Sequence, residues 1–397
     1  MAHLSYVTFT PGNNLTDATT VALGAFPYTF TYTGDFATER TVNQSAYKAT
    51  LTSGSSITGG FFGQGDGDAA LFMETGTAIY GDLDLIGQGE HYLNNLGLVS
   101  GDVTLGNSSD LIDNYGSIGG DVRMGGGDDY FQNFATDTMR GDVAGTLRMG
   151  SGDDRVLNAG TLDRVFLGDG NDFYSAVQDD LNYDNYDNPA VFASEVRGGN
   201  GNDVMYGGAN DDVFMGGQGR DVLNGHGGND TLMGGNNKDV LRGGEGNDVL
   251  YGDGGKDRLY GGNGDDQLFG GTGEDLIDGG RGNDMLSGGS GSDVFVFAGN
   301  SGADIITDFD ATRDMVSLPD ALVGGLPAFS DADVLAHLTY AGGNAVLDLS
   351  GLYQDLGLGG MSGFSNADDI TVTFLDVKPG ELTGDNFMTP GDAFLVA

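Results

Sequence analysis

Aspartate recurs every nine residues through the middle of the chain, a spacing that could create a row of metal sites. The eleven positions are Asp203, Asp212, Asp221, Asp230, Asp239, Asp248, Asp257, Asp266, Asp275, Asp284 and Asp293. Each follows a glycine-rich stretch whose backbone carbonyls can turn toward the same place as the carboxylate. Six or more carboxylate and carbonyl oxygens in a flexible arrangement suit Ca²⁺, whereas Mg²⁺ requires a stricter octahedron. The spacing therefore predicts calcium sites.

The element that must position these aspartates is a nine-residue unit, repeated eleven times without insertion over residues 198–296. Six residues of each unit predict a turn, three predict a short strand, and the eighth residue is always apolar. Glycine suits the turn because several positions need a positive φ. Two units make one coil of 18 residues, so that the apolar side chains stack into a narrow core. The predicted architecture is a parallel β-roll.

This array resembles the nonapeptide repeats of the repeats-in-toxin (RTX) family of secreted bacterial proteins, with the consensus GGxGxDxUx. The resemblance implies that calcium lies between turns of adjacent coils on the same edge, so that unit n pairs with unit n+2 and about nine Ca²⁺ ions bind. The implied ligands are the eleven aspartates and backbone groups of the turns. For the latter we take Asn200 and the first residue of each unit: Gly198, Gly207, Gly216, Gly225, Gly234, Gly243, Gly252, Gly261, Gly270, Gly279 and Gly288.

Four turns depart from this consensus at a glycine position. The second repeat has Ala209 and Asn210, and the fifth has Asn237, where the second glycine of the GxG pair is expected. Asparagine tolerates a left-handed conformation better than most residues. His226 and Asp253 replace the second glycine of their units. The sites beside His226 and Asp253 are expected to bind calcium most weakly.

A longer repeat precedes the array. Its aspartates are Asp110, Asp129, Asp154 and Asp172, His91 holds the same position in the first copy, and the spacings are 19, 19, 25 and 18 residues. An asparagine follows four residues later in the first four copies, at Asn95, Asn114, Asn133 and Asn158. These spacings predict a parallel β-helix in which the asparagines form a hydrogen-bonded ladder. Gly-Asp-Leu or Gly-Asp-Val segments at Gly81, Gly101, Gly120 and Gly141 predict a further strand in each rung.

Together the repeats predict an all-β chain, with a parallel β-roll preceded by a parallel β-helix-like solenoid and followed by a β-rich C-terminal cap. The expected divisions are an N-terminal β cap (1–60), a degenerate β-helix (61–178), an acidic, tyrosine-rich loop (179–197), the calcium β-roll (198–296) and the C-terminal cap (297–397). The one helix expected is Asp331 to His337. The final residues, GDAFLVA, are similar to the uncleaved C-terminal signal of type I secretion substrates.

The composition restricts the classes of partner that the chain is expected to bind. The chain has 59 acidic and 16 basic residues, a net charge of −43, which disfavours binding to nucleic acid or anionic membranes. No cysteine is present, which excludes disulfides and thiolate-ligated metals. No uninterrupted apolar run reaches about 18 residues, so no membrane span is predicted. Because no N-terminal secretory peptide is recognised, we expect type I export and an extracellular or cell-surface location.

Two function classes remain open. In the first, the protein is a secreted calcium-binding component of a surface layer, matrix or adhesive structure, which folds outside the cell and binds itself or an acidic cell-surface polysaccharide. In the second, it is a carbohydrate-active enzyme of the lyase or epimerase type, with a groove on the β-helix and His91 as a candidate. No residue is assigned as catalytic, and neither HExxH nor GxSxG occurs outside the repeat. Tyr183 and Tyr186, in the acidic loop, could bind a sugar or another calcium ion.

Overall fold

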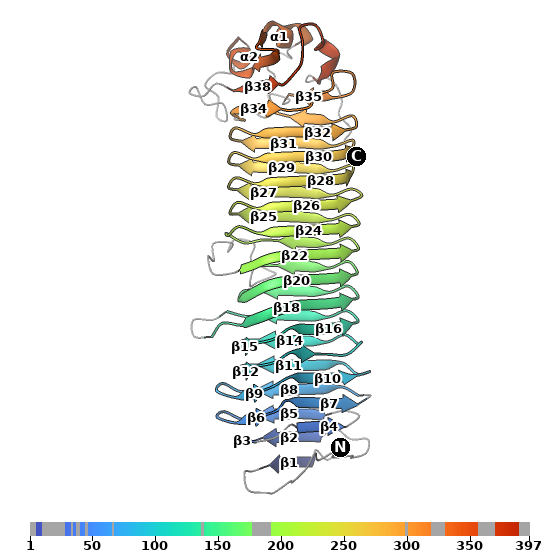
Figure 1. Cartoon of the computed structure of the whole chain (residues 1–397), viewed down its shortest axis with the longest axis vertical. Helices are drawn as coiled ribbons and strands as arrows, with labels where there is room; N and C mark the ends of the chain where they lie inside the picture. Colours follow the sequence, from blue (N-terminus) through green and yellow to red (C-terminus); the bar gives the residue numbers. More distant parts are fainter. Residues whose placement is uncertain are drawn as a thin grey trace, which may run out of the picture. The chain divides into compact units, whose positions relative to one another are not determined.

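The computed structural model describes residues 5–9, 28–32, 35–36, 40–43, 47–65, 67–135, 139–176, 192–297, 301–318, 330–355 and 370–388. The chain forms two compact units, Met1–Ala209 and Asn210–Ala397. Within each unit, most strands pair in parallel with the strand one coil later (Figure 1). The prediction of an all-β parallel solenoid is confirmed. Tyr183 and Tyr186 lie outside the described residues.

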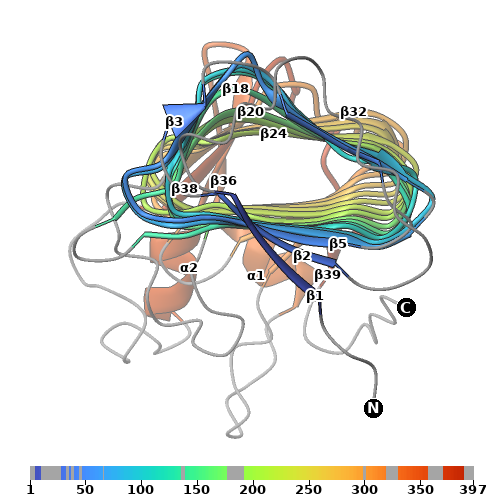
Figure 2. The ribbon, with the colours of Figure 1, turned by 90° about the horizontal axis from the view of Figure 1, so that it is seen from below.

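Unit 1 is a parallel solenoid whose strands fall into two hydrogen-bonded sets. The first set is β1 (Ser5–Phe9), β2 (Tyr28–Tyr32), β5 (Tyr47–Leu51), β8 (Ala69–Met73), β11 (His91–Asn95), β14 (Leu111–Asn114), β17 (Tyr130–Asn133), β19 (Arg155–Asn158), β21 (Phe173–Ser175) and β23 (Val204–Tyr206). The second set is β3 (Asp35–Phe36), β4 (Arg40–Asn43), β6 (Ser56–Thr58), β7 (Phe61–Gly65), β9 (Ala78–Tyr80), β10 (Leu83–Gly87), β12 (Leu98–Val99), β13 (Val103–Thr104), β15 (Ser117–Ile118), β16 (Val122–Gly126), β18 (Asp142–Ser151), β20 (Thr161–Asp169) and β22 (Phe192–Asn200). Figure 2 looks along the stack, with β2 and β5 on one side of the coil and β18 and β20 on the other.

The strands expected within residues 1–60 are present and follow the same coil pattern. Strand β2 pairs in parallel with β5, and β5 pairs in parallel with β8. Strands β3 and β4 pair with β6 and β7 of the next coil. That residues 1–60 act as an N-terminal β cap remains a prediction.

Asparagine side chains form the predicted ladder inside unit 1. Asn95 Nδ2 donates to Asn114 Oδ1 at 2.8 Å, Asn114 Nδ2 donates to Asn133 Oδ1 at 2.8 Å, and Asn133 Nδ2 donates to Asn158 Oδ1 at 3.0 Å. All four side chains are buried beside apolar residues of the same strands, such as Leu93. Because each amide both donates and accepts along the stack, the polar groups are satisfied without water.

Replacing Asn114 by Ala is expected to destabilise these coils by about 1–3 kcal/mol, because the Asn95 amide loses its buried acceptor. Denaturant unfolding followed by hydrogen exchange over residues 91–133 measures the cost. The matched control is Asn107→Ala, since Asn107 is exposed. Equal protection in the two variants would contradict a stabilising ladder.

The Gly-Asp segments supply the extra strand in three of four coils. Those at Gly81, Gly101 and Gly120 lead into β10, β13 and β16, which pair in parallel with one another. The prediction for Gly141 is wrong, because Asp142 and Val143 pair with β15 instead. In this coil Thr146 takes the place of the expected aspartate, and Leu147 pairs with β16. The spacing from Asp129 to Asp154 is 25 residues instead of 18 or 19, and Ala135 and Arg140 form an antiparallel bridge within this interval.

Unit 2 contains most of the nonapeptide array. Its strands are β24 (Val213–Gln218), β25 (Val222–Gly227), β26 (Thr231–Asn236), β27 (Val240–Glu245), β28 (Val249–Gly255), β29 (Arg258–Asn263), β30 (Gln267–Gly273), β31 (Leu276–Arg281), β32 (Met285–Ser290) and β33 (Val294–Val296). Alternate strands pair in parallel with a register of 18 residues, as in Leu232 with Leu250 and Leu241 with Leu259. The apolar side chain of the eighth position is fully buried in every unit.

Three of the four turns that lack a consensus glycine have a left-handed backbone at the substituted position. His226, Asn237 and Asp253 adopt φ values of 73°, 81° and 67°. A non-glycine residue there carries a conformational cost. That the sites beside His226 and Asp253 bind calcium most weakly remains a prediction.

The end of unit 2 is the predicted β-rich cap, with two short helices. It comprises β34 (Ala303–Ile306), β35 (Met315–Ser317), α1 (Asp331–Ala336), β36 (Leu338–Ala341), β37 (Asn344–Asp348), α2 (Leu349–Asp355), β38 (Thr371–Phe374), the 3-10 turn η1 (Gly384–Asn386) and β39 (Phe387–Met388). Helix α1 matches the prediction. Helix α2 was not predicted, because Gly351 argues against a helix, yet Leu349 and Leu352 are fully buried on it.

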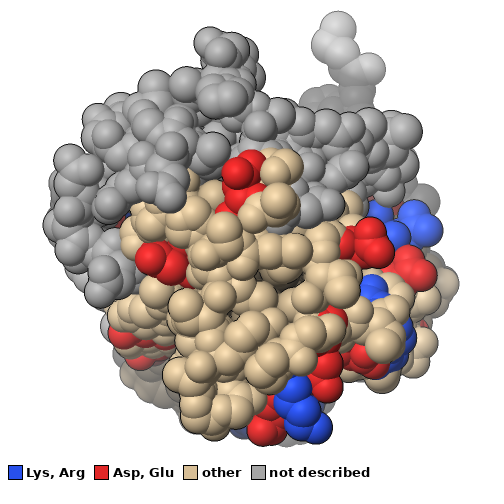
Figure 3. Space-filling model, turned by 90° about the horizontal axis from the view of Figure 1, so that it is seen from above, with Lys and Arg blue, Asp and Glu red and all other residues tan. Residues whose placement is uncertain are grey.

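Seen from the α1 end (Figure 3), the described surface has a largely uncharged centre with acidic and basic groups mainly around it. Among the described residues, neither helix is long and apolar enough to cross a membrane.

Candidate metal centre

The glycine-rich turn sets the position of each array aspartate. At the end of β29 and just after it, Gly262 and Gly264 have φ values of 122° and 132°, in the region that disfavours a side chain. The backbone N–H of Gly264 donates to the carbonyl oxygen of Arg281, one coil later, at 2.8 Å. The turns on one edge thus stack closely, and each ends on an aspartate that points under the turn.

The aspartates form a continuous hydrogen-bonded row along each edge of unit 2. From Asp212 to Asp275, the backbone N–H of each array aspartate donates to Oδ1 of the aspartate 18 residues later, for example Asp239 to Asp257 at 2.8 Å and Asp257 to Asp275 at 2.8 Å. On the other edge Asp230 donates to Asp248 at 2.7 Å. All eleven predicted aspartates are buried, with at most 4% of their surface exposed. This hydrogen bond links a nonapeptide to the second nonapeptide after it. That calcium lies between the same paired turns remains a prediction.

The second carboxylate oxygen of the row has no hydrogen-bond partner at many positions. In the described part of unit 2, buried Oδ2 atoms without a partner belong to Asp230, Asp239, Asp248, Asp257, Asp266, Asp275, Asp284 and Asp293. A buried carboxylate oxygen without compensation is costly. A cation is the simplest compensation, so these oxygens fit a metal ion.

A carbonyl of the next coil lies beside this oxygen. A Cβ at Gly252 would lie 2.7 Å from Asp257 Oδ2 and 2.5 Å from the carbonyl oxygen of Gly270. The same point at Gly270 is 2.7 Å from Asp275 Oδ2 and 2.8 Å from the carbonyl oxygen of Gly288. The sequence-predicted carboxylates and first-position glycines are therefore brought together, and a side chain on the glycine would fill the space.

Burial also disfavours the ionised form of these carboxyl groups. Desolvation raises the pKa of Asp239 to about 8 and that of Asp257 to about 7, and neighbouring aspartates of the row add to both shifts. Among the described residues, no three His, Cys, Asp or Glu side chains converge. The atoms that the turns bring together are carboxylate and carbonyl oxygens, the hard donor set that Ca²⁺ prefers.

One predicted ligand differs from the others. Asn200 is exposed, its Nδ2 donates to Asp169 Oδ1 at 2.6 Å, and its carbonyl accepts the N–H of Gly170 at 2.7 Å. The other backbone candidates, the first-position glycines, are all buried. The ligand role of Asn200 remains a prediction.

Two further aspartates, Asp304 and Asp314, continue the hydrogen-bonded rows of unit 2 and were not predicted from the sequence. Asp284 N–H donates to Asp304 Oδ1 at 2.9 Å, and Asp293 N–H donates to Asp314 Oδ1 at 3.1 Å. Both lie outside the nonapeptides, at spacings of 20 and 21 residues. The signal that could have revealed them is the buried apolar residue two positions later, Ile306 or Val316, as in every repeat.

In chelator, lowering the pH is expected to favour the metal-free fold of the array. Desolvation raises the pKa of Asp239 to about 8 in the folded array without metal, whereas the unfolded chain keeps the ordinary value of about 4. The folded state therefore binds the proton more tightly, so this contribution to stability is fully present below about pH 4 and is lost as the pH rises through about 8. Circular dichroism in chelator measures it, and an array that is equally unfolded at pH 4 and pH 8 would contradict the expectation.

Comparison with known proteins agrees with this geometry. A family model described as the RTX calcium-binding nonapeptide repeat matches four times, at residues 197–232, 207–241, 233–268 and 260–295. No curated protein matches the chain. Among solved structures, the chain is similar to the extracellular lipase LipA from Serratia marcescens, with 18% identity and a TM-score of 0.21. That match covers 53% of this chain and 42% of the lipase.

Proposed function

We propose that this chain, which carries RTX calcium-binding nonapeptide repeats at residues 197–295, is an extracellular structural protein whose array folds when calcium binds. The observation that supports it most directly is the row of buried Oδ2 atoms without partners in unit 2. With about nine ions the array holds the calcium between paired turns, and the aspartates and first-position glycines are the ligands.

Charge explains why calcium and export are coupled. Residues 198–296 contain 17 acidic and 6 basic residues, so the empty array has a net charge of −11 and repels itself when compact. Cytosolic calcium is too scarce for weak sites, whereas extracellular calcium reaches the range of about 10⁻³ M that such sites need. The array therefore stays unfolded during passage through a type I exporter and folds outside the cell.

A structural role is favoured over catalysis. The side chain of His91, the candidate of the enzyme alternative, is buried, with 3% of the residue exposed, and its Nδ1 lies 2.9 Å from Asp110 Oδ1. A general acid or base must come within hydrogen-bonding reach of its substrate. His91 cannot do so here, and it serves instead as a partner of Asp110.

Calcium is expected to drive self-association or attachment to an acidic polysaccharide. Nine ions would still leave a charge of roughly −25 on the chain of net charge −43, so further cations can bridge molecules. Sedimentation across a calcium titration should show larger species, with magnesium as the control ion. A reducing-end assay on the same polysaccharides should show no product. A strictly monomeric protein that binds no cells would contradict the structural role, and calcium-dependent cleavage would establish an enzyme.

A further inference from the structure

Three turns of unit 1, upstream of the residues that the family model matches, have the backbone conformation of the array turns. They span residues 125–129, 150–154 and 168–172. Each has a positive φ at two glycines, such as 121° at Gly150 and 130° at Gly152. In each, the N–H of the second of these glycines donates to a carbonyl one coil later, as Gly152 does to Asp169 at 2.8 Å. The array turns use the same bond, as Gly264 does to Arg281.

The aspartates that end these turns also form the same row. Asp129 N–H donates to Asp154 Oδ1 at 2.8 Å, Asp154 N–H to Asp172 Oδ1 at 2.8 Å, and Asp172 N–H to Asp203 Oδ1 at 2.9 Å. Asp129, Asp154 and Asp172 are 1–2% exposed, and their Oδ2 atoms have no hydrogen-bond partner. Asp128 and Asp153, at the preceding position, add two exposed carboxylates to the same edge.

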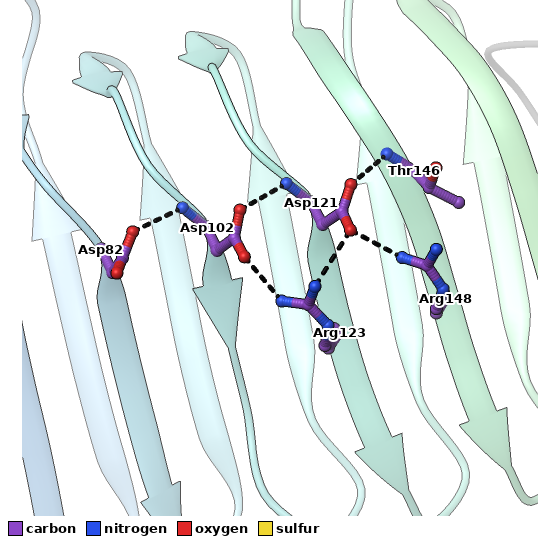
Figure 4. Close-up of polar contacts among 6 residues, drawn as sticks. All are labelled: Asp82, Asp102, Asp121, Arg123, Thr146 and Arg148. Atoms are coloured by element: carbon purple, nitrogen blue, oxygen red, sulfur yellow. Dashed lines mark hydrogen bonds and ion pairs between the residues drawn. The ribbon is translucent and has the colours of Figure 1, made fainter.

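Another aspartate row in unit 1 shows how such oxygens are otherwise neutralised (Figure 4). Asp102 N–H donates to Asp82 Oδ1, Asp121 N–H donates to Asp102 Oδ1, and Thr146 N–H donates to Asp121 Oδ1, at 2.9–3.0 Å. In this row the second oxygens of Asp102 and Asp121 are paired with side-chain cations. The Arg123 guanidinium lies 2.8 Å from Asp102 Oδ2 and 3.0 Å from Asp121 Oδ2. The Arg148 guanidinium lies 2.8 Å from Asp121 Oδ2.

The aspartate row that runs through these three turns begins one coil earlier, at Asp110. Both carboxylate oxygens of Asp110 have hydrogen-bond partners within the protein. Asp110 Oδ1 accepts from His91, through the backbone N–H at 2.7 Å and the ring at 2.9 Å, and Asp110 Oδ2 accepts the N–H of Gly106 at 3.1 Å. The turn before Asp110 contains Ser108 and Ser109 and has no positive φ. Both carboxylate oxygens of Asp110 are therefore satisfied, and the need for an external cation starts one coil later.

We infer that the turns 125–129, 150–154 and 168–172 bind additional Ca²⁺ ions, between the aspartate pairs Asp129–Asp154, Asp154–Asp172 and Asp172–Asp203. Buried, unpartnered carboxylate oxygens and stacked carbonyls carry the inference. A Cβ at Gly150 would overlap the carbonyl oxygen of Gly125, which shows how closely those carbonyls stack. The inference rests on the proposed calcium function of the array and extends calcium binding into the wider coils of unit 1.

One difference separates these turns from the array. The position of the first glycine is held by Met124, Met149 and Leu167, whose side chains are fully buried. The wider coil has an interior that these side chains fill, whereas the narrow array coil has no room for them. A side chain at this position occupies part of the space that the glycine leaves open beside the carboxylate in the array. We therefore expect weaker calcium affinity at the upstream turns.

The test is the number of calcium ions bound by the full chain, measured by equilibrium dialysis and native mass spectrometry. The triple variant Asp129→Asn, Asp154→Asn, Asp172→Asn keeps an oxygen that accepts the N–H of the neighbouring coil but removes the charge. It should lose about three ions relative to the parent protein. The matched control Asp102→Asn, Asp121→Asn removes carboxylates from neighbouring coils that already have arginine partners, and it should lose none.

A third variant separates this inference from the function of the array. Asp239→Asn, Asp257→Asn, Asp275→Asn should lose array ions while the upstream ions remain. A parent protein that binds no calcium would overturn the proposed function, whereas an unchanged count in the upstream triple variant would overturn only the inference. Hydrogen exchange of the parent protein gives a measurement without any variant. Calcium should increase the protection of residues 125–172, and unchanged protection there would also overturn the inference.

Discussion

In excess chelator, residues 198–296 are expected to lose their β structure, and millimolar calcium is expected to restore it. Each nine-residue unit buries one large apolar side chain, whereas ordering the backbone costs about 1–2 kcal/mol per residue. The buried carboxylates oppose folding further until a cation compensates them. Binding free energy must therefore supply folding free energy, as in other metal-coupled folds.

Hydrogen exchange of the full chain, with and without chelator, measures this effect segment by segment. The array should change from strong protection to exchange near the rate of an unfolded chain. Residues 69–114 provide an internal control, because the Asn95 side chain donates to Asn114 there and Asp110 already has its partners. Magnesium at the same concentration should restore little order, since its octahedral geometry is stricter. An array that stays protected in chelator would refute calcium-coupled folding.

Replacing Gly264 by Ala is expected to destabilise the surrounding coils by about 3 kcal/mol, roughly a hundredfold in their folding equilibrium. Gly264 has a φ of 132°, and a Cβ there would overlap the carbonyl oxygen of Gly246 in the preceding coil. The overlap is with backbone, so a rotamer change cannot relieve it. The coils must separate, and the calcium sites between them must open.

A neighbouring glycine provides the control for that variant. Gly254 has no positive φ, and its nearest contact with a Cβ would be Thr272 Oγ1 at 3.3 Å, the end of a side chain that can rotate. Gly254→Ala should therefore stay within about 1 kcal/mol of the parent protein. The calcium concentration at half-folding, followed by circular dichroism, should rise for Gly264→Ala and hardly change for Gly254→Ala. Equal midpoints would show that the turns do not depend on close backbone stacking.

The periodic parts of the fold and of the site could be predicted from the sequence because a repeat imposes the same contacts on every unit. The interval of nine residues fixed which side chains enter the core, and the eighth-position residues are all buried. The asparagine ladder followed from the same argument, since equivalent positions of successive coils must stack. A repeat thus converts local spacing into long-range contact.

The parts that broke the period could not be predicted. Asp304 and Asp314 continue the aspartate rows, but their spacing depends on where the chain re-enters the stack. Asp142 follows a Gly-Asp-Val pattern yet lies in another strand, because an insertion displaced it. Helix α2 depends on the burial of Leu349 and Leu352 in the C-terminal cap, which local propensity does not reveal.

The 18-residue register of unit 2 makes its length an adjustable quantity. Removing the 18 residues 249–266 would join Asp248 to Gln267, and every later strand would keep its sheet and its edge, one step of about 4.8 Å lower. Removing nine residues would instead transfer each later strand, including β34 and β35, to the opposite sheet. Selection can therefore lengthen or shorten this part of the molecule by whole coils. Each remaining pair of stacked turns, and the calcium site between them, stays unchanged.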